Sequence, residues 1–393
     1  MDMAGRILVL NTGSSSIKYE LVDVRTRDRP ARGLVERIGE AGPGRLTHRA
    51  GDGPPYVRER PFPGHGEGLD AMMEAFAAAG PELAPVAVGH RVVHGGTRFT
   101  EAVLIDDGVI AAIEELAPLA PLHNPVNLTG IRVARKAFPG VPQVAVFDTA
   151  FHRTLPPEAY TYAVPREWGV RRFGFHGTSC AYVSRRAAAI LGRDLAELDL
   201  IVLHLGNGAS ATAISGGRSV DTSMGMTPLE GLVMGTRSGD VDPALAGYLA
   251  RVDGLDAQQI EQALSRHGGL LALTGTGDMR EVRGRDDEAA RLALEIYTRR
   301  IRKYVGAYYA LLGRVDAIVF TGGVGEHDAA TRAASLAGLA RLGITVDPAL
   351  NQADADGERA VSPAGAEVPV LVVPTDEEWE IARQALSLIA GSP

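Results

Sequence analysis

Short apolar runs that end in polar, glycine-containing turns recur along this chain of 393 residues. Residues 7–10 are apolar and lead into the polar turn 11–16, after which apolar and polar positions partly alternate. The same order returns at 200–203, an apolar run that is followed by the turn 204–208 and a second run at 209–214. This pattern predicts a strand, a tight turn and a strand. Its two copies indicate an internally duplicated chain.

The rest of the pattern alternates between helical and strand-like segments. We predict a helix at 298–312, a strand at 317–321, a last strand at 368–373 and a closing helix from about Glu377. Residues 47–68 are rich in Gly, Pro and charge, which predicts a surface excursion with a short edge structure. The alternation predicts an α/β protein in two parts.

Length and composition limit the class of protein. The chain is long enough for two domains that each bury a core, and its 45% hydrophobic and 22% charged residues are ordinary for an enzyme. A net charge of -8 argues against a nucleic-acid partner, and no apolar run reaches the roughly 20 residues that span a bilayer. The lone Cys180 excludes an internal disulfide, and no signal-peptide pattern opens the sequence. We expect a cytoplasmic protein without a membrane partner.

Three turns could hold phosphate groups. The first offers backbone N–H groups, the hydroxyls of Ser14 and Ser16, and the cation of Lys18. An ordinary hairpin turn explains this segment equally well. The second turn at 206–208 favours phosphate binding, because glycines in both halves permit close backbone approach. The third, at 322–326, follows a predicted strand and lacks the Walker spacing.

A few charged residues stand where a site would need them. Arg91 ends an apolar run before a glycine turn, and Arg237 lies between glycines, so both guanidinium groups could grip a carboxylate or phosphate. His176 also lies between glycines, although a structural role is the commoner fate of a histidine. Asp148 and Glu377 could help to hold Mg²⁺, or could cap helices.

Taken together, these segments resemble the acetate kinase family within the acetate and sugar kinase, heat-shock ATPase and actin superfamily. The resemblance covers nearly the whole chain and rests on several long motifs. They are VLNTGSSSIKY from Val9, GHRVVHGG from Gly89, PLHNPVNLTGI from Pro121, VFDTAFH from Val146, FGFHGTS from Phe173, HLGNGAS from His204, DTSMGMTPLEGLVMGTRSGDVDP from Asp221 and FTGGVGE from Phe320.

The resemblance implies two similar lobes of the actin-like ATPase type, each a mixed sheet flanked by helices, with a nucleotide cleft between them. The acceptor and phosphate-binding lobe would comprise residues 1–150 and the C-terminal helix 380–393. The nucleotide-binding lobe would comprise residues 151–379. A homodimer is also implied.

The implied reaction is reversible, direct in-line transfer of the γ-phosphoryl group of ATP to acetate, giving acetyl phosphate and ADP. Asn11 and Glu377 match the family's Mg²⁺ positions, where Mn²⁺ is an alternative metal. His176 and Arg237 would stabilise the transition state, with Arg91 and Asp148 also catalytic. The implied acid-binding residues are Arg91, Val93, Leu122, Phe175 and Pro228. The implied ATP-binding residues, besides Ser14, Ser16 and Lys18, are His204, Leu205, Gly206, Asn207, Gly208, Asp278, Met279, Arg280, Gly323, Val324, Gly325, Glu326 and His327.

Physical reasoning constrains one of these roles. Acetate, with a pKa close to the 4.3 or so of a glutamate, is already ionised at pH 7, so the nucleophile has no proton to lose. A general base is therefore poorly motivated, and we expect Asp148 to orient an arginine or to hold Mg²⁺ through water. Cys180 stands where the family usually has His, and His327 where it usually has Asn, which puts the nucleotide preference in question. The alternatives are a propionate or other short-chain carboxylate kinase and, from another class, an actin-like ATPase chaperone.

Overall fold

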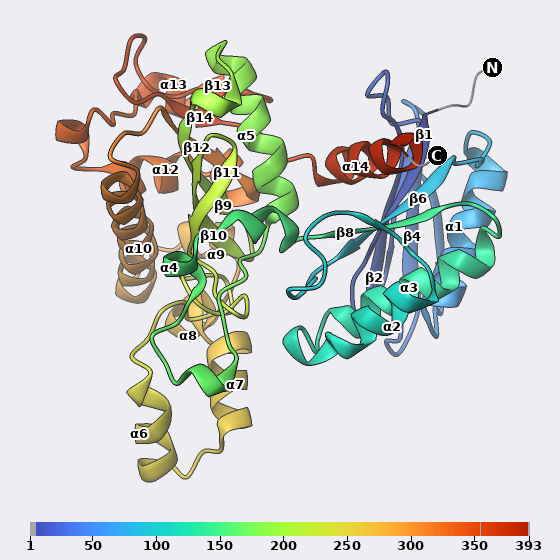
Figure 1. The fold of residues 1–393 in the computed structure, drawn as a ribbon, viewed down its shortest axis with the longest axis horizontal. Coiled ribbons are helices and arrows are strands. Elements are labelled where there is room, and N and C mark those ends of the chain that lie inside the picture. Colours follow the sequence, from blue (N-terminus) through green and yellow to red (C-terminus); the bar gives the residue numbers. More distant parts are fainter. Residues whose placement is uncertain (1–4, 354, 392–393) are drawn as a thin grey trace. The chain divides into compact units, whose positions relative to one another are not determined.

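The chain folds as two compact α/β units in the computed structural model, which describes residues 5–353 and 355–391. The first unit contains the residues up to Ala150 and those from Asp376 onward, and the second contains residues 151–375. Figure 1 shows one sheet with flanking helices in each unit. The prediction of an α/β fold with two mixed sheets is confirmed. No helix in the described ranges is long and apolar enough to cross a membrane.

The first unit is built on an eight-stranded mixed sheet, in the order β5-β4-β3-β2-β1-β6-β8-β7 among the described residues. Strands β1, β6 and β8 run parallel, so their carboxyl ends meet at one edge of the sheet. The remaining neighbours are antiparallel. The strands are β1 (Arg6–Thr12), β2 (Ser16–Asp23), β3 (Ala31–Glu36), β4 (Gly44–Ala50), β5 (Tyr56–Arg60), β6 (Ala87–Val92), β7 (Val103–Leu104) and β8 (Gln143–Phe147).

Helices cover both faces of this sheet. Helices α1 (His65–Ala79) and α3 (Asn124–Ala137) share one apolar core with Val88 of β6. The next residue, Gly89, points to the opposite face, where a Cβ atom would come within 2.8 Å of Ile381 in α14 (Glu377–Gly391). A glycine is thus needed for α14 to pack closely. Helix α2 (Asp107–Glu115) packs beside α3.

The second unit repeats the same plan on a six-stranded sheet, ordered β11-β10-β9-β12-β14-β13 among the described residues. Strands β9, β12 and β14 are parallel and almost entirely buried, as their apolar sequences require. The strands are β9 (Asp199–Leu205), β10 (Ala209–Ser215), β11 (Arg218–Thr222), β12 (Ala317–Thr321), β13 (Arg359–Ala360) and β14 (Val370–Val372).

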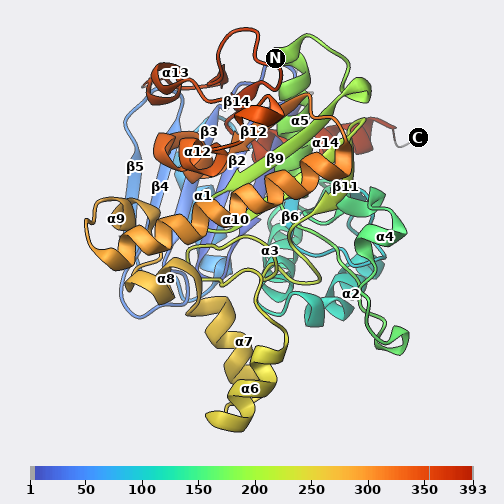
Figure 2. The ribbon, with the colours of Figure 1, turned by 90° about the vertical axis from the view of Figure 1, so that its left-hand side faces the viewer.

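Helices again flank this sheet on two sides, with α5 on one side and α10 and α12 on the other (Figures 1 and 2). Helices α6 and α7 project away from the strands in both views. The helices of this unit are α4 (Pro157–Tyr160), α5 (Gly177–Leu191), α6 (Ala244–Val252), α7 (Ala257–Arg266), α8 (Gly269–Thr274), α9 (Met279–Arg283), α10 (Glu288–Leu312), α11 (Gly322–His327), α12 (Ala329–Leu336) and α13 (Pro348–Gln352).

Several predicted elements differ from the structure. The helix predicted at 298–312 begins at Glu288, because the Asp287 side chain caps it by accepting from the Ala290 N–H. The last strand is only Val370–Val372, and the predicted turn at 322–326 is the start of helix α11. The region 47–68 contains the predicted short edge structure, since β5 is an edge strand of the first sheet, but it also contains most of β4 and the first turn of α1.

The boundary of the second lobe also lies slightly earlier than predicted. Residues 376–379, assigned to that lobe from the sequence, belong to the first unit. Asp376 accepts a hydrogen bond from Arg29, and the Arg27 guanidinium lies 4.4 Å from the centre of the Trp379 ring. These contacts fix the start of α14 to the first sheet.

Candidate functional site

The first unit gathers its polar side chains around Arg91, at the carboxyl edge of the parallel strands. Arg91 near the end of β6 donates from Nη2 to Asp148 Oδ2 at 2.6 Å and from Nε to Oδ1 at 3.2 Å. Its Nη1 lies 3.4 Å from Asn11 Oδ1, at the end of β1, and its Nε lies 3.9 Å from a carboxylate oxygen of Glu377. Arg91, Asp148, Asn11 and Glu377, predicted from separate motifs, therefore meet on one guanidinium.

Burial and nearby charges shift the pKa values of Arg91 and Glu377 in this cluster. Burial alone would lower the pKa of Arg91, but the carboxylates of Asp148 and Glu377 outweigh it and raise that pKa. Burial raises the pKa of Glu377 to about 7, helped by the nearby Asp148 charge and opposed by Arg91. Glu377 therefore changes charge near neutral pH.

Two asparagines of α3 position the segment after β6, and sequence reasoning missed their role. Buried Asn127 accepts from the Val93 N–H at 3.1 Å and donates to the Thr12 carbonyl at 2.9 Å. Buried Asn124 accepts from the His94 N–H and donates to the His94 carbonyl. The spacing of the two asparagines, three residues apart on one helix face, could have predicted this role, since buried amides form hydrogen bonds.

The predicted phosphate turn of the first unit lies between β1 and β2 and carries Ser14. Ser16 begins β2, and its carbonyl accepts from the Gly13 N–H, as in an ordinary hairpin. Lys18 pairs with Glu378 at 2.5 Å and remains about half exposed. Contact of this turn with phosphate stays a prediction.

The predicted acyl pocket draws on residues of both units. Val93 is buried just beyond β6, whereas the Leu122 side chain is half exposed. Phe175 and Pro228 belong to the second unit, where Phe175 is buried. The pocket itself stays a prediction.

His176 and Arg237 converge in the second unit. A Cβ atom on Gly208 would lie 3.4 Å from both His176 Nε2 and Arg237 Nη1, so the glycine leaves the space in front of both side chains open. His176 is held from behind, with Nδ1 3.0 Å from Ser210 Oγ and its ring stacked on His204 at 4.1 Å. Its backbone has a φ of 56°, a left-handed conformation that is costly for a residue with a side chain and is typical of functional sites.

Arg237 is a guanidinium whose hydrogen-bond partners are neutral. It donates to the Pro228 carbonyl at 3.3 Å and lies 3.7 Å from the sulfur of Met234. Within the described residues no carboxylate forms an ion pair with it, and burial lowers its pKa. A partly buried cation without an acidic partner favours an anionic ligand.

The loop that carries Arg237 is fixed by side chains rather than by secondary structure. Asp240 accepts from the Gly231 N–H at 2.8 Å and from the Tyr304 hydroxyl at 2.8 Å, closing the loop at its base. Arg300 donates to the carbonyls of both Gly231 and Asp240. Arg237 thus lies on a loop that two residues of helix α10 hold in place.

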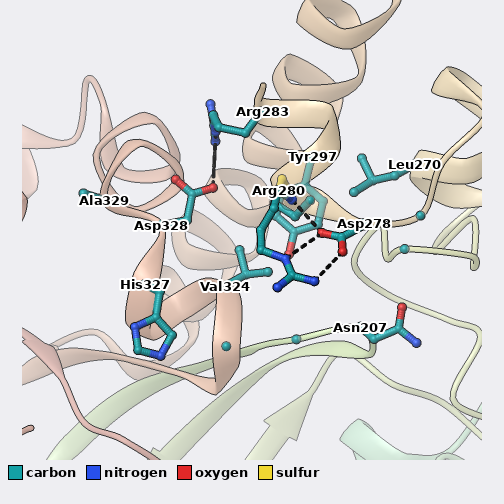
Figure 3. Close-up of a pocket in the computed structure, with 15 residues that line it drawn as sticks. Asn207, Leu270, Asp278, Arg280, Arg283, Tyr297, Val324, His327, Asp328 and Ala329 are labelled. Atoms are coloured by element: carbon teal, nitrogen blue, oxygen red, sulfur yellow. Dashed lines mark hydrogen bonds and ion pairs between the residues drawn. The ribbon is translucent and has the colours of Figure 1, made fainter. Parts of the chain in front are cut away.

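A cavity of about 820 Å³ lies beside His176 and Arg237, entirely within the second unit. Figure 3 shows it bounded by the end of α11 on one side and by the α9 segment on the other. Its volume is that of a site for a nucleotide-sized ligand. The lining residues are Gly206, Asn207, Gly235, Leu270, Gly277, Asp278, Met279, Arg280, Arg283, Tyr297, Gly323, Val324, His327, Asp328 and Ala329.

Not every predicted ATP-binding residue lines this cavity. Leu205 is fully buried in β9, and Glu326 turns its carboxylate to the N–H groups of Gly322 and Thr375. Gly325 offers its carbonyl to the buried Arg332. The sequence analysis also missed some residues that line the cavity. One of them is Arg283, which forms an ion pair with Asp328 at 3.0 Å (Figure 3). They lie on elements far apart in the chain, so spacing alone could not reveal them.

The two departures from the family pattern have different surroundings. Cys180 is fully buried in α5, with its sulfur 3.6 Å from Thr212 Oγ1, so it packs in the core. His327 is three-quarters exposed at the end of α11 and lines the cavity. The exchange of Asn for His at this position therefore falls within reach of a ligand.

The fold and the two groups of side chains define a class. Two units that repeat one strand plan, each with its polar side chains at the carboxyl edge of the parallel strands, are characteristic of the actin-like ATPase fold. Arg237 and His176, which meet in front of Gly208, and the cavity beside them suit a phosphate-bearing ligand.

Comparison with known proteins identifies the family. The model of the acetokinase family matches residues 6–383, and the chain belongs to that family. It is 56% identical to an acetate kinase of Streptomyces coelicolor in an alignment of 402 positions that covers 98% of each chain. It superposes on the crystal structure of Porphyromonas gingivalis acetate kinase with a TM-score of 0.92 at 44% identity, covering 98% and 100% of the two chains. A propionate kinase from Francisella tularensis gives a TM-score of 0.91 at 39% identity, covering 97% and 98%.

The raised pKa of Glu377 predicts a pH-dependent effect of Glu377→Gln. The fold favours the neutral form of the Glu377 carboxyl. Its contribution to the free energy of unfolding is therefore fully present below the pKa of an unfolded glutamate, and it is lost as the pH rises through about 7. The amide imitates the neutral form. Glu377→Gln should therefore stabilise the protein at pH 8, by at most about 3 kcal/mol, and change little at pH 5.

Thermal unfolding without metal or nucleotide measures this difference. Glu288→Gln provides the matched control, because Glu288 also lies in the first turn of a helix but is exposed. An equal effect of Glu377→Gln at the two pH values would contradict the raised pKa.

Proposed function

We propose that the protein is an acetate kinase, which transfers the γ-phosphoryl group of ATP to acetate and catalyses the reverse reaction. The observation that carries the proposal is the convergence of Arg237 and His176 on Gly208, beside a nucleotide-sized cavity. Relatives named acetate kinase, at about 56% identity over nearly the whole chain, support the same activity.

The second unit would bind the nucleotide and stabilise the transferring group. Phosphoryl transfer requires mainly alignment and charge stabilisation from the protein. The cavity would take the nucleoside, with the phosphates directed along the turn from Gly206 to Gly208. Arg237 and His176 would then donate to the equatorial oxygens of the transferring phosphoryl group, where negative charge builds up.

The first unit would bind the acid. The Arg91 guanidinium is held flat by its two bonds to Asp148, and such a rigid fork presents its remaining N–H groups in one direction. This geometry supports a role for Asp148 in orienting Arg91. Because acetate is already ionised, no residue is needed to remove a proton from it.

Mg²⁺ would be held near Asn11 and Glu377. Within the described residues no group of three or more His, Cys, Asp and Glu side chains is arranged for a metal. One amide oxygen and one carboxylate nevertheless fit a cation that keeps several waters and binds phosphate oxygens. Bound there, Mg²⁺ or Mn²⁺ would neutralise charge on the β- and γ-phosphates.

The acid that the enzyme prefers is the principal alternative. A solved relative is a propionate kinase at 39% identity, and a hydrophobic pocket discriminates by only about 1–3 kcal/mol per methylene. The partly buried cation beside the cavity argues for an anionic substrate rather than for a chaperone of the same fold class.

We also propose a cytoplasmic homodimer. The buried free thiol of Cys180 suits a reducing compartment. Helix α6 has no buried residue, and it exposes more than half of the Tyr248 and Val252 side chains on a part of the second unit that projects from the sheet (Figure 1). A second copy of the chain would cover this apolar surface.

Arg237→Lys tests the assignment of the transferring group. Lysine keeps the charge but loses the planar fork, so kcat should fall about 10- to 1000-fold with a smaller change in the KM for ATP. Steady-state kinetics of acid-dependent ADP formation measures both constants. Arg218→Lys, at an exposed position in β11, should leave them unchanged. An unaltered kcat for Arg237→Lys would place Arg237 outside the chemistry.

The proposed function itself is tested by trapping the product. The purified protein with Mg²⁺, ATP and acetate should form an acyl phosphate that hydroxylamine converts to a hydroxamate. Propionate should react with a kcat/KM roughly 10- to 200-fold lower, and butyrate more poorly still. A preference for propionate would make the protein a propionate kinase. ATP hydrolysis that does not depend on any acid would contradict the kinase assignment.

A further inference from the structure

A chain of hydroxyl groups runs behind His176 to the end of the second unit. Thr375 is the last residue of that unit, and its hydroxyl donates to Ser179 Oγ at 2.8 Å. Ser179 Oγ in turn lies 2.8 Å from Nδ1 of His204. His204 stacks on His176, with ring centres 4.1 Å apart and planes 21° apart. These contacts connect the backbone after β14 to the imidazole pair.

The backbone holds both residues that contribute a hydroxyl to this chain. Ser179 lies in the first turn of α5 and is fully buried. The Thr375 N–H donates to Glu326 Oε1 at 3.3 Å, and the same oxygen accepts from the Gly322 N–H at 2.9 Å. The backbone of Thr375 is therefore held beside the start of α11, within reach of Ser179. Water has no access to the buried Ser179 hydroxyl that could replace either partner.

The single proton of the Ser179 hydroxyl determines which way the hydrogen bonds of this chain point. A serine hydroxyl has one proton and two acceptor sites. Since Ser179 Oγ accepts from Thr375, its own proton is free to be donated, and the acceptor within reach is Nδ1 of His204. An imidazole that accepts at Nδ1 and is neutral carries its proton on Nε2.

We propose that Thr375 and Ser179 are positioning residues that hold His204 as the neutral Nε2–H tautomer, so that His204 acts as a hydrogen-bond donor at Nε2. The inference rests on the proposed kinase function for the identity of the anion, but not for the tautomer. His204 would then donate one hydrogen bond next to the contacts of His176 and Arg237.

Nuclear magnetic resonance of the full-length protein with ¹⁵N-labelled histidine tests the tautomer directly. The protein has 10 histidines, and the spectrum of His204→Gln assigns the signal of interest. In the wild type at pH 8, His204 should carry its proton on Nε2, with Nδ1 unprotonated. Ser179→Ala should produce a mixture of the two tautomers. A proton on Nδ1 of His204 in the wild type would overturn the proposal.

Kinetics supplies a second readout. Loss of the Ser179 hydroxyl should lower kcat about 10-fold with less than about a threefold change in the KM for ATP. Thr375→Val has the same shape without the donor and should show a smaller loss in the same direction, whereas Thr375→Ser should restore the wild-type values. Equal tautomer populations and kcat in Ser179→Ala and the wild type would overturn the proposal.

Ser184→Ala is the matched control, because Ser184 is equally buried in α5 but donates to the Ala181 carbonyl of its own helix. It should change neither the His204 tautomer nor kcat. If no variant or wild-type protein phosphorylates an acid, the kinase function fails, but the tautomer measurement still decides whether the hydroxyl chain exists.

Discussion

The paired hydrogen bonds between Arg91 and Asp148 are the interaction on which the first half of the site depends. Asp148 is 2% exposed, so its charge is taken out of water and must be compensated within the fold. Removing one partner of such a buried pair typically costs about 3–5 kcal/mol, because the other charge is left alone. The pair forms because β6 and β8 are parallel neighbours whose carboxyl ends coincide. Asn11 and Glu377 are then placed by their contacts with the same guanidinium.

The second unit uses an arginine in the opposite way. Arg237 has neutral partners, and its loop is held by Asp240, Tyr304 and Arg300 at a distance from the guanidinium itself. The internal duplication thus gives the same strand order with different electrostatics. The first unit presents a compensated cation that is fixed in direction. The second presents a cation whose charge an incoming phosphate would neutralise. Phosphoryl transfer requires this arrangement.

The sequence allowed prediction of what depends on local pattern and strand ends. The strand at 317–321 coincides with β12, and Arg91 and Asp148 meet because both follow apolar runs. Contacts made between distant elements could not be predicted. Asn127 reaches Thr12, and Thr375 reaches Ser179, across separations of 115 and 196 residues. The start of α10 was missed because its Asp287 cap precedes the segment with the clearest helical pattern. A cap acts through a single side chain, which periodicity does not reveal.

We propose above all that the second unit binds the nucleotide, while the Arg91 pair binds the acid and positions Asn11 and Glu377. Calorimetric titration of metal-free ADP into the double variant Arg91→Gln/Asp148→Asn tests this most directly, since the variant removes both charges and leaves neither of the two buried alone. We expect an ADP Kd within about threefold of the wild type, together with loss of acid-dependent phosphoryl transfer. An ADP affinity weakened by more than about tenfold in a folded variant would contradict it.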